Sequence, residues 1–86
     1  MIEKSIKVTN EVGLHARPAA MLVKAAAKYS SNIDIRYKDK TANCKSILSL
    51  MSLRVKQGEI VSLNISGEDE EIALKEIVSL FENNFE

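Results

Sequence analysis

The spacing of the apolar residues changes within the first 30 residues, and this change limits the folds open to the chain. Ile2, Ile6 and Val8 recur with a period near two, which is typical of a strand with one buried face. Lys4 interrupts that series. From Pro18 onward the apolar residues fall at positions 19, 20, 22, 23, 26 and 27, which is helical spacing. The chain is therefore expected to be an α+β protein whose first strand leads into a helix.

Three further strands are predicted from alternating residues. They cover 33–37, 41–44 and 60–66, and a polar connection at 38–40 joins the first two of them. The turn at 57–59 precedes the last strand. Cys44, the only cysteine, is expected to be a small buried hydrophobic residue, and no intramolecular disulfide can form.

Two further helices are predicted, one in the middle of the chain and one at its end. Ser46 is a good N-cap for a short helix that follows it, in which residues 47, 50, 51 and 53 could share a face. Acidic residues crowd the first turn of a helix over 68–86 and complement its dipole. In this last helix we expect these residues to lie near one another: Ile72, Ala73, Ile77, Leu80, Phe81 and Asn84. The order βαββαβα predicts an antiparallel sheet with its helices packed on one face.

Length and composition indicate a single domain over residues 1–86. The chain is 45% hydrophobic and 28% charged, enough for one modest core. Its formal net charge of zero gives no support for binding nucleic acid or an anionic membrane. No apolar run approaches the roughly 20 residues of a membrane span, so we expect no membrane insertion and a cytoplasmic protein.

The charges are unevenly distributed along the chain. Residues 1–67 carry eleven Lys and Arg against five Asp and Glu, whereas residues 68–86 carry one Lys against seven acids. A site in the basic part would favour an anionic substrate or an acidic partner.

His15, the only histidine, is the strongest candidate functional residue. A hydrolase is disfavoured because nothing nearby in the sequence supplies a nucleophile and an orienting acid. A metal site is disfavoured because there is no second histidine or cysteine cluster, and we expect neither a metal nor a cofactor. The third interpretation is that His15 is itself a nucleophile that carries a transferred group.

Local physical chemistry favours the third interpretation. Positions 14–17 contain no Ser, Thr, Asp or Asn, so the first N–H groups of the helix lack a side-chain cap and can bind an anion. Arg17 adds a planar donor suited to phosphate. Taken alone, however, a histidine near a helix start is more often a surface or packing residue. Arg17 is equally compatible with an ordinary surface arginine, and Ser46 with a simple cap.

The stretch from Ile47 to Leu53 holds more large apolar residues than one buried stripe of a short helix can accommodate. Some of them are expected to face solvent. An exposed apolar patch often marks a partner site.

These motifs, in this order, resemble the histidine-containing phosphocarrier (HPr) family of the bacterial phosphoenolpyruvate-dependent sugar phosphotransferase system. The matching stretches span essentially the whole chain: Gly13-Leu14-His15-Ala16-Arg17-Pro18-Ala19, Lys45-Ser46-Ile47, Leu50-Met51-Ser52-Leu53, Gln57-Gly58 and Ser66-Gly67-Glu68-Asp69-Glu70. The resemblance implies an open-faced βαββαβα sandwich, with a four-stranded antiparallel sheet and three helices on one face.

The resemblance also implies a function. His15 would accept a phosphoryl group from phosphoenolpyruvate-charged enzyme I and pass it to enzyme IIA components of sugar permeases. Arg17 would stabilise the phosphohistidine. Such a protein is a monomeric carrier with a covalent intermediate rather than a free-standing enzyme. The residues implied in partner docking lie on the first two helices: Ala16, Arg17, Ala20, Lys24, Ile47, Leu48, Ser49 and Met51.

Ser46 aligns with a regulatory position of the family. In Gram-positive relatives this serine is phosphorylated by an ATP-dependent kinase, which slows transfer through the histidine and creates a corepressor for a catabolite-control transcription factor. The residue also occurs in bacteria that lack the kinase. The alternative function is therefore a regulatory interaction module that uses the same fold and helical face.

Three positions depart from the usual family pattern. Val12 stands where relatives often have a polar residue near the histidine. Ser49 and Arg54 replace residues that are often glycine in the Gram-positive branch, and Ser49 is expected to alter partner affinity. A paralogous branch has lost the histidine and acts only in regulation, and His15 argues against that branch.

Overall fold

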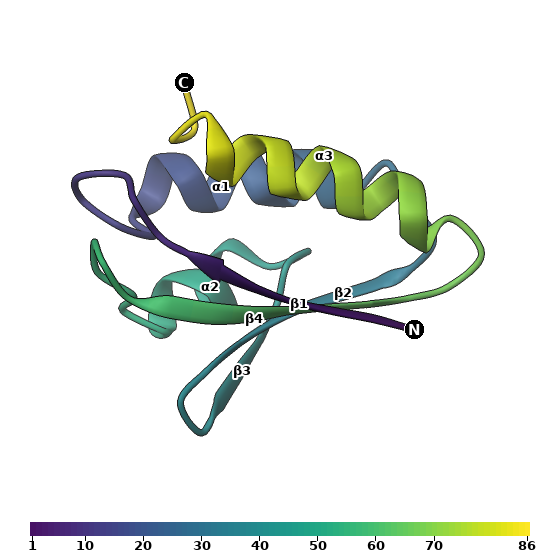
Figure 1. Cartoon of the computed structure of the whole chain (residues 1–86), viewed down its shortest axis with the longest axis horizontal. Coiled ribbons are helices and arrows are strands. Elements are labelled where there is room, and N and C mark those ends of the chain that lie inside the picture. The colour runs from purple at the N-terminus through teal and green to yellow at the C-terminus, as the bar shows by residue number, and fades with distance from the viewer.

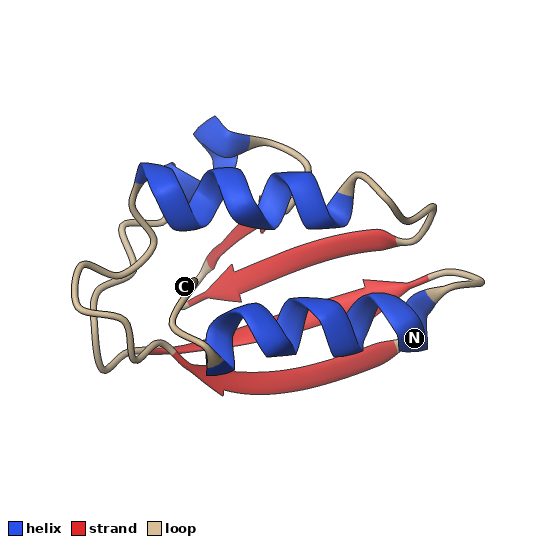
Figure 2. Cartoon of the chain, turned by 90° about the horizontal axis from the view of Figure 1, so that it is seen from above, coloured by secondary structure: helices blue, strands red, loops and turns tan.

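The strands and helices follow the predicted order in a computed structural model that describes all of residues 1–86. The elements are β1 (Ile2–Lys7), α1 (Ala16–Ala26), β2 (Asn32–Tyr37), β3 (Lys40–Asn43), α2 (Ile47–Ser52), β4 (Ile60–Ser66) and α3 (Glu70–Glu82). The strands form one antiparallel sheet in the order β1-β4-β2-β3. Helices α1 and α3 lie side by side over one face, while the other face stays open (Figures 1 and 2). The predicted open-faced α+β sandwich is confirmed.

Some element boundaries differ from the predictions by a few residues. Helix α1 begins at Ala16 rather than Pro18. Pro18 fits in the first turn of the helix because the backbone N–H that proline lacks would have no partner there. Strand β3 ends before Cys44, although the Cys44 N–H still donates to the carbonyl of Ile33 at 2.8 Å. Helix α3 covers Glu70–Glu82 and is shorter than the 68–86 expected. None of the three helices has the length and apolar character needed to cross a bilayer.

The core lies between the sheet and the two long helices. It contains the inward residues of the strands, among them Ile35, Leu63 and Ile65, which are fully buried. Leu22 of α1 and Ile77 of α3 cover them and are themselves fully buried. Burying these apolar surfaces is worth about 25 cal/mol per Å² and is the main source of stability.

Cys44 belongs to the same core, as its sequence context predicted. The residue is 0% exposed, and burial raises the pKa of its thiol to about 12. The thiol is therefore protonated at neutral pH and acts as a small apolar group.

One part of the prediction for α3 is wrong. Ala73, Ile77 and Phe81 are buried and Leu80 packs against them, but Ile72 is 64% exposed. Ile72 lies next to Glu71 and three residues before Lys75, which are both exposed, so it faces solvent rather than the sheet. Asn84 is likewise exposed and follows the end of the helix.

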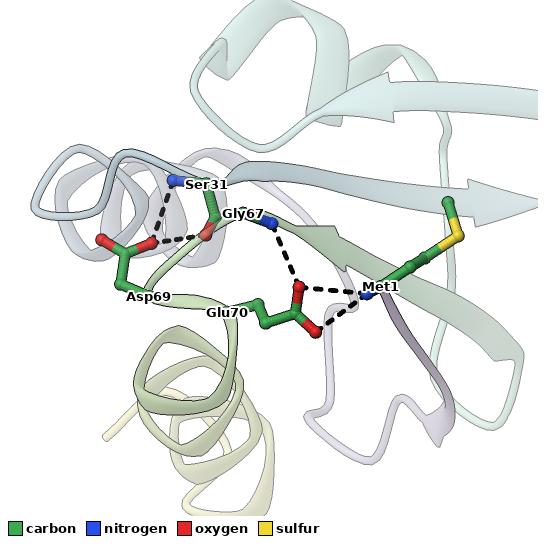
Figure 3. A network of polar contacts seen from close by, with 5 residues as sticks. All are labelled: Met1, Ser31, Gly67, Asp69 and Glu70. Carbon is green, nitrogen blue, oxygen red and sulfur yellow. Dashed lines mark hydrogen bonds and ion pairs between the residues drawn. The ribbon is translucent and has the colours of Figure 1, made fainter.

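Asp69, at the N-terminus of α3, holds the connection between α1 and β2. Its carboxylate accepts a hydrogen bond from the backbone N–H of Ser30 at 2.9 Å. It also accepts from the backbone N–H of Ser31 at 3.0 Å and from the Ser31 hydroxyl (Figure 3). The hydrogen bond from the Ser31 side chain, followed by that from the Ser30 backbone, lowers the pKa of Asp69. This contact joins segments that are 38 residues apart in sequence.

Glu70 makes a second contact of this kind one residue later. Its two carboxylate oxygens lie 2.9 and 3.0 Å from the amino group of Met1, and one of them accepts from the N–H of Gly67 at 3.2 Å (Figure 3). The start of edge strand β1 is therefore tied to the start of α3.

Replacing Asp69 with Asn should reduce the pH dependence of stability in acid. Because the pKa of Asp69 is lower in the folded state, its contribution is present above the unfolded-state pKa and is lost as pH falls through the folded-state pKa. Urea unfolding of the wild type should therefore show a steeper loss of stability between about pH 5 and pH 2 than Asp69→Asn shows. Glu68→Gln, which changes an exposed carboxylate with no hydrogen bond, is the control and should behave like the wild type. Equal acid slopes for Asp69→Asn and the wild type would contradict this role.

Candidate functional site

His15 is the N-cap residue of α1 and its side chain is exposed. The residue has extended backbone angles, φ −87° and ψ −168°, and no side chain caps the helix. The predicted absence of a side-chain cap is confirmed. The carbonyl of His15 accepts a hydrogen bond from the N–H of Ala19 at 3.0 Å, which is the first hydrogen bond of the helix.

The helix start beside His15 presents free hydrogen-bond donors. The N–H groups of Ala16 and Arg17 make no hydrogen bond within the chain, and Pro18 has no N–H. These two donors and the positive end of the helix dipole are suited to an anion. The guanidinium of Arg17 is exposed and forms no ion pair, so it can contribute to the same anion site.

The segment that presents His15 is fixed to the loop between α2 and β4. Gly13 has φ +74°, and a Cβ added there would lie 2.2 Å from the carbonyl oxygen of Val55, so only glycine fits. The next residue, Leu14, is 3% exposed and its N–H donates to the same oxygen at 3.1 Å. The backbone just before His15 is therefore held by the close packing of Gly13 against Val55 and by the hydrogen bond from Leu14 to Val55.

His15 and Arg17 line one open depression of about 530 Å³ at the end of the molecule. Residues from three distant parts of the chain complete its walls, and they are Thr9, Asn10, Glu11, Val12, Pro18, Gln57, Asn84, Phe85 and Glu86. The sequence analysis did not predict the C-terminal residues here. Phe85 is 2% exposed and packs edge-on against Phe81, with ring centroids 4.9 Å apart, which holds the chain end beside the depression.

Asn10 is the other residue that the sequence analysis missed. It is only 9% exposed, and its side-chain Nδ2 donates to the carbonyl of Gly13 at 2.6 Å. The sequence does contain a signal for this contact, since an Asn in a turn often forms a hydrogen bond from its side chain to the nearby backbone.

Ser46 caps the second helix, as predicted. Its hydroxyl oxygen accepts from the N–H of Ser49 at 3.2 Å. Helix α2 packs against α1 (Figure 2), so Ser46 belongs to the same side of the molecule as α1.

The apolar residues of α2 are divided between core and solvent. Leu50 and Leu53 are buried, whereas Leu48 is 81% exposed and Ile47 and Met51 are about 40% exposed. The expectation that some of this run faces solvent is confirmed. The implied docking residues on α1 are exposed as well, and they are Ala16, Arg17, Ala20 and Lys24. Ser49 differs, since it is half-buried and its hydroxyl accepts from the N–H of Asn43 at 3.1 Å.

Comparison with known proteins identifies the group to which this architecture belongs. The family described as "PTS HPr component phosphorylation site" matches residues 2–83. The chain belongs to the HPr family. It is 42% identical over 85 residues to the phosphocarrier protein HPr of Xylella fastidiosa, covering 99% of this chain and 96% of that one. The crystal structure of HPr from Thermoanaerobacter tengcongensis superposes with a TM-score of 0.94 at 48% identity, covering 99% of this chain and 96% of that one.

A regulatory relative is also similar. The catabolite repression protein Crh of Bacillus subtilis, described as a domain-swapped dimer, is 37% identical, with a TM-score of 0.78, and the match covers 96% of this chain and 95% of that one. Membership of the HPr family makes this chain a phosphocarrier protein of the phosphotransferase system, and the purely regulatory alternative is not favoured.

Two departures from the usual HPr pattern have visible structural consequences. Val12 is 64% exposed in the wall of the depression and carries no polar group that could bond to His15. Arg54 has φ +56°, a left-handed conformation that glycine adopts without strain. The glycine that relatives often have at this position therefore has a backbone reason, and Arg54 takes the same conformation at a cost.

Gly13→Ala should destabilise the protein far more than Gly58→Ala. Both glycines have positive φ, but a Cβ at Gly58 meets nothing within 4 Å. Gly58→Ala should therefore cost only the left-handed strain of about 1 kcal/mol, whereas Gly13→Ala should cost at least about 2 kcal/mol more, because Val55 must move. Urea unfolding measures both. Equal losses for the two variants would mean that the contact with Val55 does not fix the histidine segment.

Proposed function

We propose that His15 is the residue of this phosphocarrier that bears the phosphoryl group. The observation that carries the proposal is the pair of unpartnered N–H groups, Ala16 and Arg17, beside an exposed imidazole at an uncapped helix start. A phosphate on a ring nitrogen of His15 would lie against these donors and the helix dipole, which lower the free energy of the dianion. The ring nitrogen attacks the phosphorus of the donor, and the N–P bond forms as the donor's bond to phosphorus breaks.

Arg17 supports the transferred group in this proposal. Its guanidinium can donate two parallel hydrogen bonds to phosphate oxygens, a geometry that lysine does not offer. The side chain is exposed and unpaired, so no competing carboxylate must be displaced first.

The proposed donor is phosphorylated enzyme I, and the proposed acceptors are enzyme IIA components. They would dock on the exposed residues of α1 and α2, two helices that contact each other; α2 supplies the exposed apolar residues Ile47, Leu48 and Met51, and α1 supplies the exposed basic residues Arg17 and Lys24. A surface that combines apolar and basic residues suits partners with acidic surfaces. Ser49 contributes less than the sequence suggested, because its hydroxyl is already bonded to Asn43.

One copy of the chain supplies His15, Arg17 and both free N–H groups. This supports a monomer as the working unit, located in the cytoplasm where the energy-coupling proteins of the system operate. No cofactor takes part in the proposed transfer.

Ser46 is the proposed regulatory site. A phosphate on this N-cap serine would lie at the positive end of α2 and can be accommodated without unfolding the helix. The added negative charge would oppose the docking of acidic partners on the neighbouring residues. A serine kinase and phosphorylase, and a catabolite-control transcription factor, are the partners that this regulation would require.

Incubation with phosphoenolpyruvate and enzyme I should label the wild type with one acid-labile, alkali-stable phosphate. His15→Ala should take up none, because no other histidine is present. His15 is exposed, so circular dichroism should show that this control variant is folded. Labelling of His15→Ala, or an unlabelled wild type, would overturn the proposal.

Incubation with ATP and an extract of the host cell should add an acid-stable phosphate to the wild type that Ser46→Ala lacks. Ser52→Ala is the matched control, since Ser52 is an exposed serine at the other end of the same helix. Mass spectrometry locates the phosphate. The phosphorylated protein should also accept phosphate from enzyme I more slowly. Label that persists in Ser46→Ala would rule out this site.

A further inference from the structure

Asn10 and Ser31 are the two buried polar residues of the protein. The burial of Ser31 is explained by its hydrogen bonds to Asp69 at the start of α3. Asn10 lies in the wall of the depression that contains His15 and Arg17.

The side chain of Asn10 and the backbone N–H of His15 donate hydrogen bonds to the same carbonyl. Asn10 Nδ2 donates to the Gly13 oxygen at 2.6 Å, and the N–H of His15 donates to the same oxygen at 3.0 Å. The N–H of Gly13 in turn donates to the carbonyl of Asn10 at 3.2 Å, which closes the turn over residues 10–13. The N–H of His15 is thus bonded to a carbonyl that the Asn10 side chain also holds.

The orientation of the amide follows from its partner. A backbone carbonyl can only accept, so the NH₂ group of Asn10 must face Gly13. This leaves Asn10 Oδ1 buried without any hydrogen-bond donor. A buried, unpaired acceptor is unfavourable, so the amide is retained at a cost to stability while its donor holds the turn.

Asn10 is the only residue whose side chain donates to the Gly13 carbonyl. Val12 has no polar atoms, and the N–H of Leu14 is already bonded to Val55 at 3.1 Å. The Gly13 carbonyl and the Leu14 N–H belong to one planar peptide unit, so the hydrogen bond to Val55 and the close packing of Gly13 hold that unit from one side, and the Asn10 side chain holds it from the carbonyl side.

We propose that Asn10 is a positioning residue for phosphoryl transfer at His15. It holds the Gly13 carbonyl, and through it the backbone of His15, so that the imidazole is presented beside the free N–H groups of Ala16 and Arg17. This inference rests on the proposed role of His15. Asn10 does not touch the transferred group. Its effect is on the orientation of the nucleophile, and a misplacement of about 1 Å in such a group can cost up to about a hundredfold in rate.

The test compares Asn10→Ala and Asn10→Asp with the wild type in transfer from phosphorylated enzyme I. Both variants lose the donor to Gly13, and the carboxylate of Asn10→Asp would in addition repel that carbonyl. We expect kcat to fall about tenfold in Asn10→Ala, and further in Asn10→Asp, with KM little changed because the docking residues of α1 and α2 are untouched.

Ser31→Ala is the matched control. It removes the side-chain hydrogen bond of the other buried polar residue, which lies beyond the C-terminal end of α1, and should keep the wild-type kcat even if it unfolds at lower urea. The loss of one hydrogen bond is a small part of the stability of a folded domain. All variants should therefore be folded at 10 °C, and circular dichroism checks this.

A second measurement separates positioning from stability. The ¹H–¹⁵N shifts of the His15 imidazole should move in Asn10→Ala and stay at their wild-type values in Ser31→Ala. Wild-type kcat and wild-type imidazole shifts in both Asn10 variants would overturn the inference while leaving the proposed role of His15 intact. If the wild type itself takes up no phosphate, the proposed function fails instead.

Discussion

The coverage of only one face of the sheet is the constraint on which the rest of this structure depends. A four-stranded antiparallel sheet in an 86-residue chain can bury one face against helices and leave the other in water. Helices α1 and α3 cover that face (Figure 2), and their residues Leu22 and Ile77 are fully buried. One side of each helix is buried in the core. The outer side of α1, its first turn and most of α2 are left available for other molecules.

The site forms where several chain segments meet at one end of the sheet. Strand β1 ends where β4 begins, since Lys7 pairs with Ile60. The loops beyond these two residues therefore lie together, and the side chain of Gln57 donates to the carbonyl of Thr9 at 3.1 Å. Helix α3 runs back to the same end and brings the C-terminus there (Figure 1). The start of α1 is thus surrounded by fixed backbone, and His15 needs no enclosed pocket to be held in place.

The N-termini of α1 and α2 differ in whether a side chain caps the free N–H groups of the first turn. Each helix begins with N–H groups that have no partner within the helix. In α2 the hydroxyl of Ser46 satisfies one of them. In α1 no side chain does, and the free donors lie beside a nucleophilic imidazole. The difference is one residue type at the N-cap. It leaves α1 ready to receive an anion and gives α2 a cap that a modification could alter.

The sequence by itself determined the order of the elements, the single core, the Ser46 cap, the missing cap at His15 and the exposure of part of α2. These follow from periodicity and from the chemistry of individual residues, which act over a few positions. The tertiary structure decided what depends on distant segments. It placed Val55 against Gly13, brought Phe85 to the His15 depression and buried Asn10. It also turned Ile72 outward, because which side of α3 meets the sheet is set by packing and not by helical spacing alone. Local patterns identify which residues can do chemistry, whereas contacts across the chain fix where their atoms lie.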